Sequence, residues 1–195
     1  GEGLPGRVSL PGYSRTMGPQ THLFAERERL QKLTWEHFNV HQMSPTIGAE
    51  IEGPDLSTDL PQEVIDDIQQ ALWDYKVIFF RNQNITSEQQ IQFARRFGDL
   101  EIHPFLPPNS ETPELVRFEK NAKAAGYENQ WHHDVTWREE PSRSAILRAI
   151  KIPPVGGDTL FVDANAAYEG LPDEIKEKID TLNATHDFLR AFGRV

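Results

Sequence analysis

The chain of 195 residues contains no cysteine. It can therefore form no disulfide, thiolate zinc site or thiol nucleophile, and any metal must be held by His, Asp, Glu or backbone oxygen. The chain also lacks an apolar run long enough to span a bilayer, and its N-terminal region lacks the charged-then-apolar order of a signal peptide. We therefore expect a soluble, cytoplasmic protein with no membrane partner.

Basic residues are in the minority among the charged residues. Lys and Arg number 20 against 30 Asp and Glu, which gives a formal net charge of −10. Nucleic acids and anionic membranes are bound by basic surfaces that displace counterions, so we expect neither as a partner. A local basic pocket for a small anion is compatible with this balance. Hydrophobic residues make up 37% of the chain, which is enough for one core and hence for one domain or most of one.

The N-terminal part of the chain differs in composition from the rest. Residues 1–36 begin with a stretch rich in Gly, Pro, Arg and Ser, and they contain one short helical pattern at 23–33. We interpret them as an N-terminal arm or extension that need not be fully ordered. Residues 37–195 carry the other regular patterns of the sequence.

Residues 37–195 combine β-prone runs with helical periodicity. The β-prone runs predict strands at 38–40, 47–51, 77–80, 115–118, 144–150 and 159–162. Pro61 begins an amphipathic helix, and Thr86 with Gln89 is a capping-box signal for a second helix. A last helical region follows Asn165 and starts its second part at Pro172.

The most informative polar residues lie in the segment 131–137. His132 and Asp134 are two positions apart in a β-prone segment, where alternate side chains point to the same face, while His133 points to the other. One strand can therefore offer an imidazole and a carboxylate to one ion. Such a pair is two-thirds of the 2-His-1-carboxylate set, which leaves coordination positions on Fe(II) open. Taken alone, the triplet is better interpreted as two polar residues on a solvated strand face.

The sequence WHHDVTW at 131–137 resembles the W-H-x-D-V-T-aromatic motif of the taurine dioxygenase family. Further similar motifs follow in the family's order and at similar intervals, at 77–98, 102–104, 153–160, 166–169 and 186–188. The resemblance runs from about Val40 to the last residue, so residues 37–195 are interpreted as the N-terminal portion of such a catalytic domain. It implies a mainly β fold with flanking helices, the double-stranded β-helix or jelly roll, here truncated on its C-terminal side.

The resemblance implies an oxidoreductase, a non-haem Fe(II)- and 2-oxoglutarate-dependent dioxygenase that couples O₂ reduction to decarboxylation of 2-oxoglutarate to succinate. His132 and Asp134 are then its catalytic iron ligands. Thr159, after the turn at Gly156 and Gly157, hydrogen-bonds the remote carboxylate of 2-oxoglutarate. The glycine pair independently fits a sharp backbone turn ahead of a strand. From composition alone, Thr159 is an ordinary β-branched strand residue.

The resemblance also assigns residues to a substrate pocket. His103 matches the position that donates to the sulfonate of taurine, while Val135 and Phe192 match residues that line the same pocket. Leu106 stands where taurine-specific members have a tyrosine, and Glu128 replaces a family asparagine. Leu106 removes a hydroxyl donor and Glu128 adds a charge that would repel an anion, so both argue against taurine. We expect another small organic anion, a sulfonate or alkyl sulfate ester, with an aryloxyalkanoate or similar carboxylic acid as the alternative.

Two residues that the family requires have no counterpart in the sequence. The resemblance places the second metal histidine and the arginine that binds 2-oxoglutarate beyond Val195. His186 matches a family histidine outside the iron site, so we expect His186 and Asp187 to make structural polar contacts on a strand. The chain is then a fragment of a longer enzyme, a sequence from which a region has been lost or left out, or a shortened product that binds iron poorly. A non-catalytic fragment or interaction domain is the alternative from a different class. Family members form homo-oligomers, which implies a dimer or tetramer.

Overall fold

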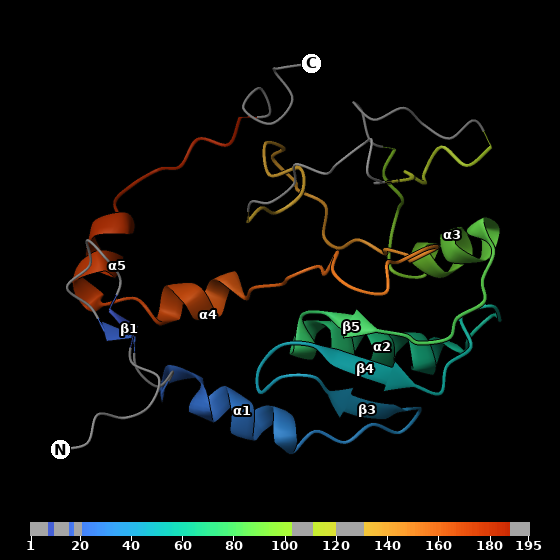
Figure 1. The fold of residues 1–195 in the computed structure, drawn as a ribbon, viewed down its shortest axis with the longest axis horizontal. Helices are drawn as coiled ribbons and strands as arrows, with labels where there is room; N and C mark the ends of the chain where they lie inside the picture. Colours follow the sequence, from blue (N-terminus) through green and yellow to red (C-terminus); the bar gives the residue numbers. More distant parts are fainter. Residues whose placement is uncertain (1–7, 10–15, 18–20, 103–110, 120–130, 188–195) are drawn as a thin grey trace. The chain divides into compact units, whose positions relative to one another are not determined.

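The computed structural model describes residues 8–9, 16–17, 21–102, 111–119 and 131–187 (Figure 1). The predicted site residues His103 and Phe192 lie outside the described residues, as do Leu106 and Glu128. Internal contacts divide the chain into two units. The first unit comprises residues 1–53, 66–81 and 160–180, and the second comprises residues 54–65, 82–159 and 181–195.

A three-stranded sheet forms the centre of the first unit. Its strand order is β3 (Asn39–Gln42), β4 (Ala49–Glu52) and β5 (Ile78–Phe79), with β3 antiparallel and β5 parallel to β4. The turn between β3 and β4 is closed by the Ile47 amide, which donates to the Ser44 hydroxyl at 3.3 Å. The strands predicted at 38–40, 47–51 and 77–80 are therefore confirmed within a residue or two.

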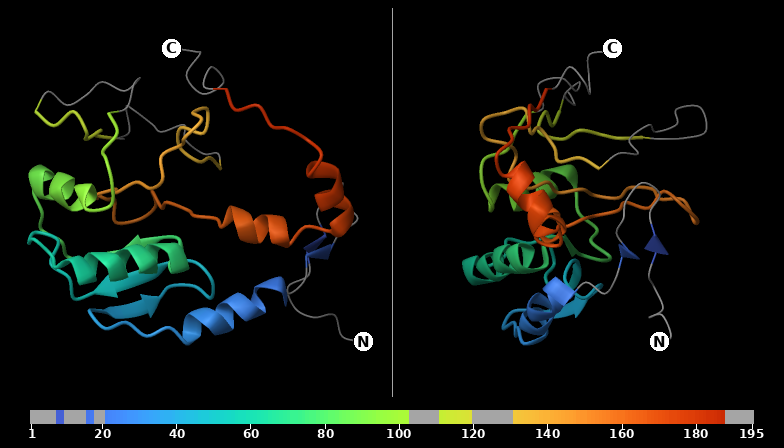
Figure 2. Two further views of the ribbon diagram at one scale, coloured as in Figure 1. Left: turned by 180° about the vertical axis from the view of Figure 1, so that it is seen from behind. Right: turned by 90° about the vertical axis from the view of Figure 1, so that its left-hand side faces the viewer.

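Helix α2 (Gln62–Tyr75) connects the parallel strands β4 and β5. Parallel neighbours need such a crossover, because a tight turn cannot return the chain to the same end of the sheet. Figure 2 shows α2 lying over one face of the sheet when seen from behind. The apolar residues of α2 recur at helical spacing, and Ile68, Ala71 and Tyr75 are at most 2% exposed. The helix predicted from Pro61 onward is confirmed.

Helix α1 (Phe24–Gln31), preceded by the 3₁₀ turn η1 (Thr21–Leu23), also contributes to the core of the first unit. Its Leu30 side chain is 1% exposed. Trp35, just after the helix, stacks on Phe38 with ring centroids 5.4 Å apart. The short helix predicted within residues 23–33 is therefore confirmed.

Charged side chains join α1 to the end of α2. Arg29 Nη1 lies 2.7 Å from Asp74 Oδ1, and Lys76 Nζ lies 3.2 Å from Glu26 Oε1 and 3.7 Å from Asp163 Oδ2. The hydrogen bond from Arg29, assisted by Lys76, lowers the pKa of Glu26 to about 2. The N-terminal helix is thus held by ion pairs as well as by the burial of its leucine.

The remaining elements of the first unit are β1 (Val8–Ser9), β2 (Thr16–Met17), α4 (Ala164–Glu169) and α5 (Asp173–Ile179). Strands β1 and β2 are antiparallel. The Asp163 side chain caps α4 by accepting a hydrogen bond from the Ala166 amide at 3.1 Å. Pro172 stands at the start of α5. The two-part helical region predicted after Asn165 is confirmed.

Helix α3 (Ser87–Arg95) is the helix of the second unit that the capping box predicted. The Thr86 hydroxyl accepts from the Gln89 amide at 3.2 Å, and the Gln89 side chain accepts from the Thr86 amide at 2.8 Å. Ile91 and Phe93 bury the inner side of the helix, with 8% and 9% exposure. Sequence alone thus located both the start and the buried face of α3.

The strands predicted at 115–118, 144–150 and 159–162 do not form among the described residues. Their backbone has no ladder partner there, and apolar side chains such as Leu147 and Ile150 are 77% and 72% exposed. A β-prone sequence favours a locally extended backbone, but a strand also needs a neighbour to share its backbone hydrogen bonds. The described residues form two small sheets and several helices, so the jelly roll stays a prediction.

Among the described residues, no helix combines the length and hydrophobicity of a membrane span.

Candidate metal site

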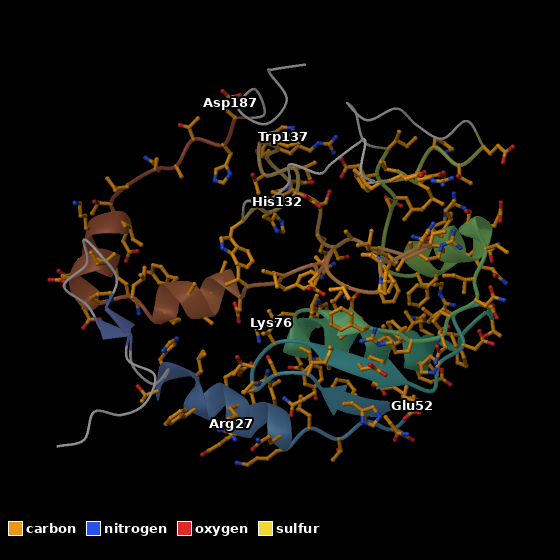
Figure 3. All side chains as sticks on the ribbon, viewed as in Figure 1. Arg27, Glu52, Lys76, His132, Trp137 and Asp187 are labelled. Atoms are coloured by element: carbon orange, nitrogen blue, oxygen red, sulfur yellow. The ribbon has the colours of Figure 1, made fainter. Side chains whose placement is uncertain are left out.

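The predicted metal residues lie at a turn of the second unit rather than on a strand. His132 precedes and Asp134 begins a turn formed by residues 134–137. Val135, the next residue, has a φ of 47°, in the left-handed region that an extended strand excludes. The prediction of a strand here is therefore wrong. Figure 3 labels His132 and Trp137 near the two ends of this segment.

The turn nevertheless brings the two predicted ligands together. His132 Nε2 lies 3.3 Å from Asp134 Oδ1, and the two side chains are 65% and 67% exposed. An imidazole nitrogen and a carboxylate oxygen are ligand types that divalent iron accepts, and both groups are accessible to an ion. Among the described residues, no group of three or more His, Asp or Glu side chains is placed to hold a metal. The pair can therefore supply two ligands of a larger set.

Val135 is the buried residue of this turn, with 4% exposure. A β-branched residue in the left-handed region is unusual, and the conformation costs about 1–3 kcal/mol. Such a conformation persists only where the surroundings hold it. Burial of the valine side chain is one restraint of that kind. Its predicted role as a lining residue of the substrate pocket stays a prediction.

A carboxylate anchors the chain just after the turn. The Arg138 amide donates to the Val135 carbonyl at 3.1 Å, and Arg138 Nη1 lies 2.8 Å from Glu101 Oε1. The Ser142 hydroxyl donates to the other oxygen of the same carboxylate. The ion pair of Arg138 with Glu101 joins residues far apart in sequence. Their opposite charges are the one sequence signal compatible with such a pair.

A second contact reaches the turn from the C-terminal segment. His186 Nδ1 lies 2.8 Å from the Thr136 hydroxyl, and residues 182–187 have no regular structure. His186 thus makes a polar contact, as expected, although its segment is not a strand. Figure 3 labels the neighbouring Asp187 on this segment. No local sequence pattern connects His186 with the metal motif, 50 positions away at Thr136.

Thr159 belongs to the same unit as His132 and Asp134, and it is exposed. Gly156 and Gly157 have φ values of 78° and 76°, so the predicted sharp turn ahead of Thr159 is confirmed. A Cβ atom at Gly157 would also lie 3.2 Å from Pro153 Cγ. The turn is present, and the contact of Thr159 with 2-oxoglutarate stays a prediction.

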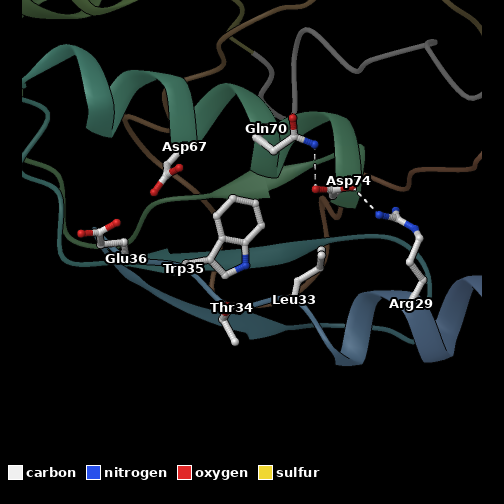
Figure 4. A pocket seen from close by; sticks show the side chains of 8 residues that line it. All are labelled: Arg29, Leu33, Thr34, Trp35, Glu36, Asp67, Gln70 and Asp74. Atoms are coloured by element: carbon white, nitrogen blue, oxygen red, sulfur yellow. Dashed lines mark hydrogen bonds and ion pairs between the residues drawn. The ribbon is translucent and has the colours of Figure 1, made fainter.

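A separate open hollow of about 540 Å³ lies in the first unit (Figure 4). Its lining residues are Arg29, Leu33, Thr34, Trp35, Glu36, Asp67, Gln70 and Asp74. They include none of the predicted site residues. The lining contains three carboxylates and one guanidinium, and the guanidinium of Arg29 already pairs with Asp74. The negative balance of this lining disfavours a dicarboxylate or a sulfonate, so we assign the hollow no part in the predicted chemistry.

Known proteins similar to this chain were found by sequence and by structure. The family model described as taurine catabolism dioxygenase TauD, TfdA family matches residues 39–194. The chain is 39% identical over 150 residues to an alpha-ketoglutarate-dependent sulfate ester dioxygenase of Pseudomonas putida, covering 76% of this chain and 49% of that protein. It is 35% identical over 153 residues to an (S)-phenoxypropionate/alpha-ketoglutarate-dioxygenase of Sphingobium herbicidovorans, covering 76% and 53%.

The structural comparison agrees with the sequence comparison. The crystal structure of a taurine dioxygenase from Burkholderia xenovorans matches with a TM-score of 0.64 and 33% identity, over 75% of this chain and 52% of that chain. The chain therefore spans about half the length of the relatives that it matches.

Proposed function

Because this chain belongs to the taurine catabolism dioxygenase TauD, TfdA family, we propose that the protein containing it is an Fe(II)- and 2-oxoglutarate-dependent dioxygenase. The observation that carries the proposal is the exposed pair of His132 and Asp134, whose Nε2 and Oδ1 atoms lie 3.3 Å apart inside the family-matched segment. We propose that residues 37–195 form the N-terminal portion of a jelly-roll catalytic domain and that residues 1–36 extend from it.

Each proposed site residue has a distinct role. His132 and Asp134 hold the iron through one imidazole nitrogen and one carboxylate oxygen, and a further ligand comes from another part of the protein. Bound iron, with 2-oxoglutarate and O₂, supplies the oxidising chemistry that hydroxylates the substrate and yields succinate and CO₂. Thr159 donates a hydrogen bond from its hydroxyl to the distal carboxylate of 2-oxoglutarate, which orients the cosubstrate.

We propose a sulfate ester or sulfonate as the substrate. His103 supplies a donor to the anionic head group, and Val135 and Phe192 line the pocket around the remainder. Leu106 offers an apolar surface where a hydroxyl would favour taurine, so the pocket accepts a longer alkyl or aryl group. The similarity to a sulfate ester dioxygenase and to an alkylsulfatase of Acinetobacter baylyi, 35% identical over 152 residues, supports this class.

An aryloxyalkanoate is the second candidate substrate. The similarity to the phenoxypropionate dioxygenase favours it, and so does an apolar residue at position 106. A carboxylate and a sulfonate are both anionic head groups, so a donor at His103 can bind either one.

We also propose that the protein forms a homo-oligomer and that its negative charge disfavours binding to nucleic acids.

The test is turnover by the intact protein that contains this chain. We expect Fe(II)-dependent consumption of O₂ and 2-oxoglutarate, with succinate formed in step with oxidation of a sulfate ester or sulfonate. A panel of alkyl sulfates, sulfonates, taurine and aryloxy acids identifies the class, scored by succinate and by released sulfate or sulfite. Asp134→Ala should abolish turnover while His133→Ala should retain it. Undiminished turnover in the Asp134→Ala variant would remove the metal assignment.

Substitution at two positions then tests the assigned roles of His103 and Leu106 in the substrate pocket. Leu106→Tyr should shift preference toward taurine, because it restores a hydroxyl donor. His103→Ala should weaken every anionic substrate without changing the KM for 2-oxoglutarate. Taurine as the best substrate of the unmodified protein by a wide margin would contradict the argument from Leu106.

A further inference from the structure

The turn that presents Asp134 is not one that its own sequence favours. Val135 is β-branched and adopts a φ of 47°, while the turn is closed locally by the hydrogen bond from the Arg138 amide to the Val135 carbonyl. A valine remains in this conformation only if the surrounding structure holds it there. The conformation of the proposed metal ligand therefore depends on whatever restrains the turn.

The restraints act at three points, two within the turn and one just after it. Arg138, just after the turn, pairs with Glu101 at 2.8 Å. Val135, at its centre, is buried. The third restraint is the hydrogen bond between Thr136 and His186, whose Oγ1 and Nδ1 atoms lie 2.8 Å apart across 50 positions of sequence.

The contact of Thr136 with His186 is a well-formed one. Its length of 2.8 Å is that of a good hydrogen bond between a hydroxyl and a ring nitrogen. A threonine hydroxyl can donate or accept, and Nδ1 of an imidazole does either according to its tautomer, so the two groups match in both neutral tautomers. The contact therefore restrains the backbone two residues after Asp134 by a direct link to a distant segment.

We propose that His186 is a positioning residue for the metal pair, acting through the Thr136 hydroxyl to hold the turn in the conformation that presents Asp134 beside His132. The proposal rests on the proposed function, because it gives His186 its role through the metal ligands. It differs from the role expected from sequence, which left His186 outside the iron site. Residues that do not contact the ion but hold its ligands in place through hydrogen bonds have a strong effect on metal affinity.

The test is Mn(II) binding by the intact protein that contains this chain, followed through the electron paramagnetic resonance signal of free Mn(II). Loss of the hydrogen bond in His186→Ala or in Thr136→Val should weaken Mn(II) binding about tenfold. This is the lower end of the effects known for residues that position a metal ligand without contacting the ion. The double variant should be no weaker than either single variant, because both remove the same contact.

Conservative variants distinguish positioning from general structure. His186→Asn keeps a polar atom at the place of Nδ1, and Thr136→Ser keeps the hydroxyl, so both should retain Mn(II) affinity within about twofold. His41→Ala is the matched control. His41 is also an exposed histidine in a polar pair, with Glu52 at 3.0 Å in the first unit, and its loss should leave Mn(II) binding unchanged.

Three results would overturn the proposal. The first is Asp134-dependent Mn(II) binding that His186→Ala leaves unchanged, which contradicts the positioning role alone. The second is a loss of affinity that His186→Asn fails to restore, or that merely follows the unfolded fraction measured by circular dichroism, which makes the contact structural. The third is Mn(II) binding that does not depend on Asp134, which contradicts the proposed metal site and the positioning role together.

Discussion

Alanine substitution of His132 and of His133, one at a time, separates metal binding from fold stability. The His132 side chain is 65% exposed, and its polar partner Asp134 is 67% exposed. An exposed pair of this kind contributes at most about 1 kcal/mol to stability, and often nothing measurable. Substitution of His132 should therefore change the free energy of unfolding by less than about 1 kcal/mol.

The expected effect on metal affinity is much larger. Substitution of residues that position a metal ligand typically lowers metal affinity by about 10- to 100-fold. Removal of a ligand itself should therefore lower the affinity by more than about 100-fold. A hundredfold loss corresponds to about 2.7 kcal/mol of binding free energy. His133 is exposed and belongs to no proposed ligand set, so His133→Ala should change affinity by no more than about twofold.

Two measurements on the same preparations decide the matter. Mn(II) titration of the intact protein reports the affinity, and urea unfolding followed by circular dichroism reports the stability. A hundredfold loss in His133→Ala with normal affinity in His132→Ala would show that the wrong histidine had been assigned. A stability loss above about 2 kcal/mol in His132→Ala would contradict the inference from exposure, since surface substitutions rarely reach it.

Three further outcomes are expected. Thr159→Val should raise the KM for 2-oxoglutarate about fivefold with little change in kcat, because a hydrogen bond worth about 1 kcal/mol is lost, and steady-state kinetics on the intact protein will measure it. Arg29 lowers the pKa of Glu26 from 4.5 to about 2, so the stabilisation is full above pH 4.5 and is lost as pH falls toward 2. Glu26→Gln should accordingly lower stability by about 1 kcal/mol at pH 7, allowing for solvent exposure, and urea unfolding should show the difference disappearing near pH 2. Thr86→Ala should destabilise the fold by about 1 kcal/mol through loss of the capping box, whereas Thr86→Ser should not.

The elements that sequence predicted well are those that neighbouring residues specify. The capping box of Thr86 and Gln89 fixes the start of α3, since both hydrogen bonds join residues three positions apart. The apolar spacing of α2 fixes which side is buried, because helical geometry repeats within the window that sequence shows. The same reasoning located β3, β4 and β5.

The features that sequence missed depend on residues distant along the chain. The backbone reversal at Val135 was unforeseen because valine ordinarily favours an extended strand, and burial with outside contacts overrides that preference. The links of Arg138 to Glu101 and of His186 to Thr136 join separate segments, which no local pattern reports. The strand predicted at 144–150 does not form among the described residues, for a related reason. A strand needs a neighbouring strand for its backbone hydrogen bonds, and the sequence of 144–150 does not specify which segment that neighbour is.

The exposed apolar side chains of the second unit have a consequence for work on the isolated chain. Leu147 and Ile150 are 77% and 72% exposed on the β-prone segment 144–150, which has no strand partner among the described residues. An exposed apolar segment with a β-prone sequence and no strand partner is a template for aggregation through strand addition. Protein concentration is therefore a variable that solution measurements on the isolated chain have to control, since self-association would reduce the fraction of monomers available to bind metal.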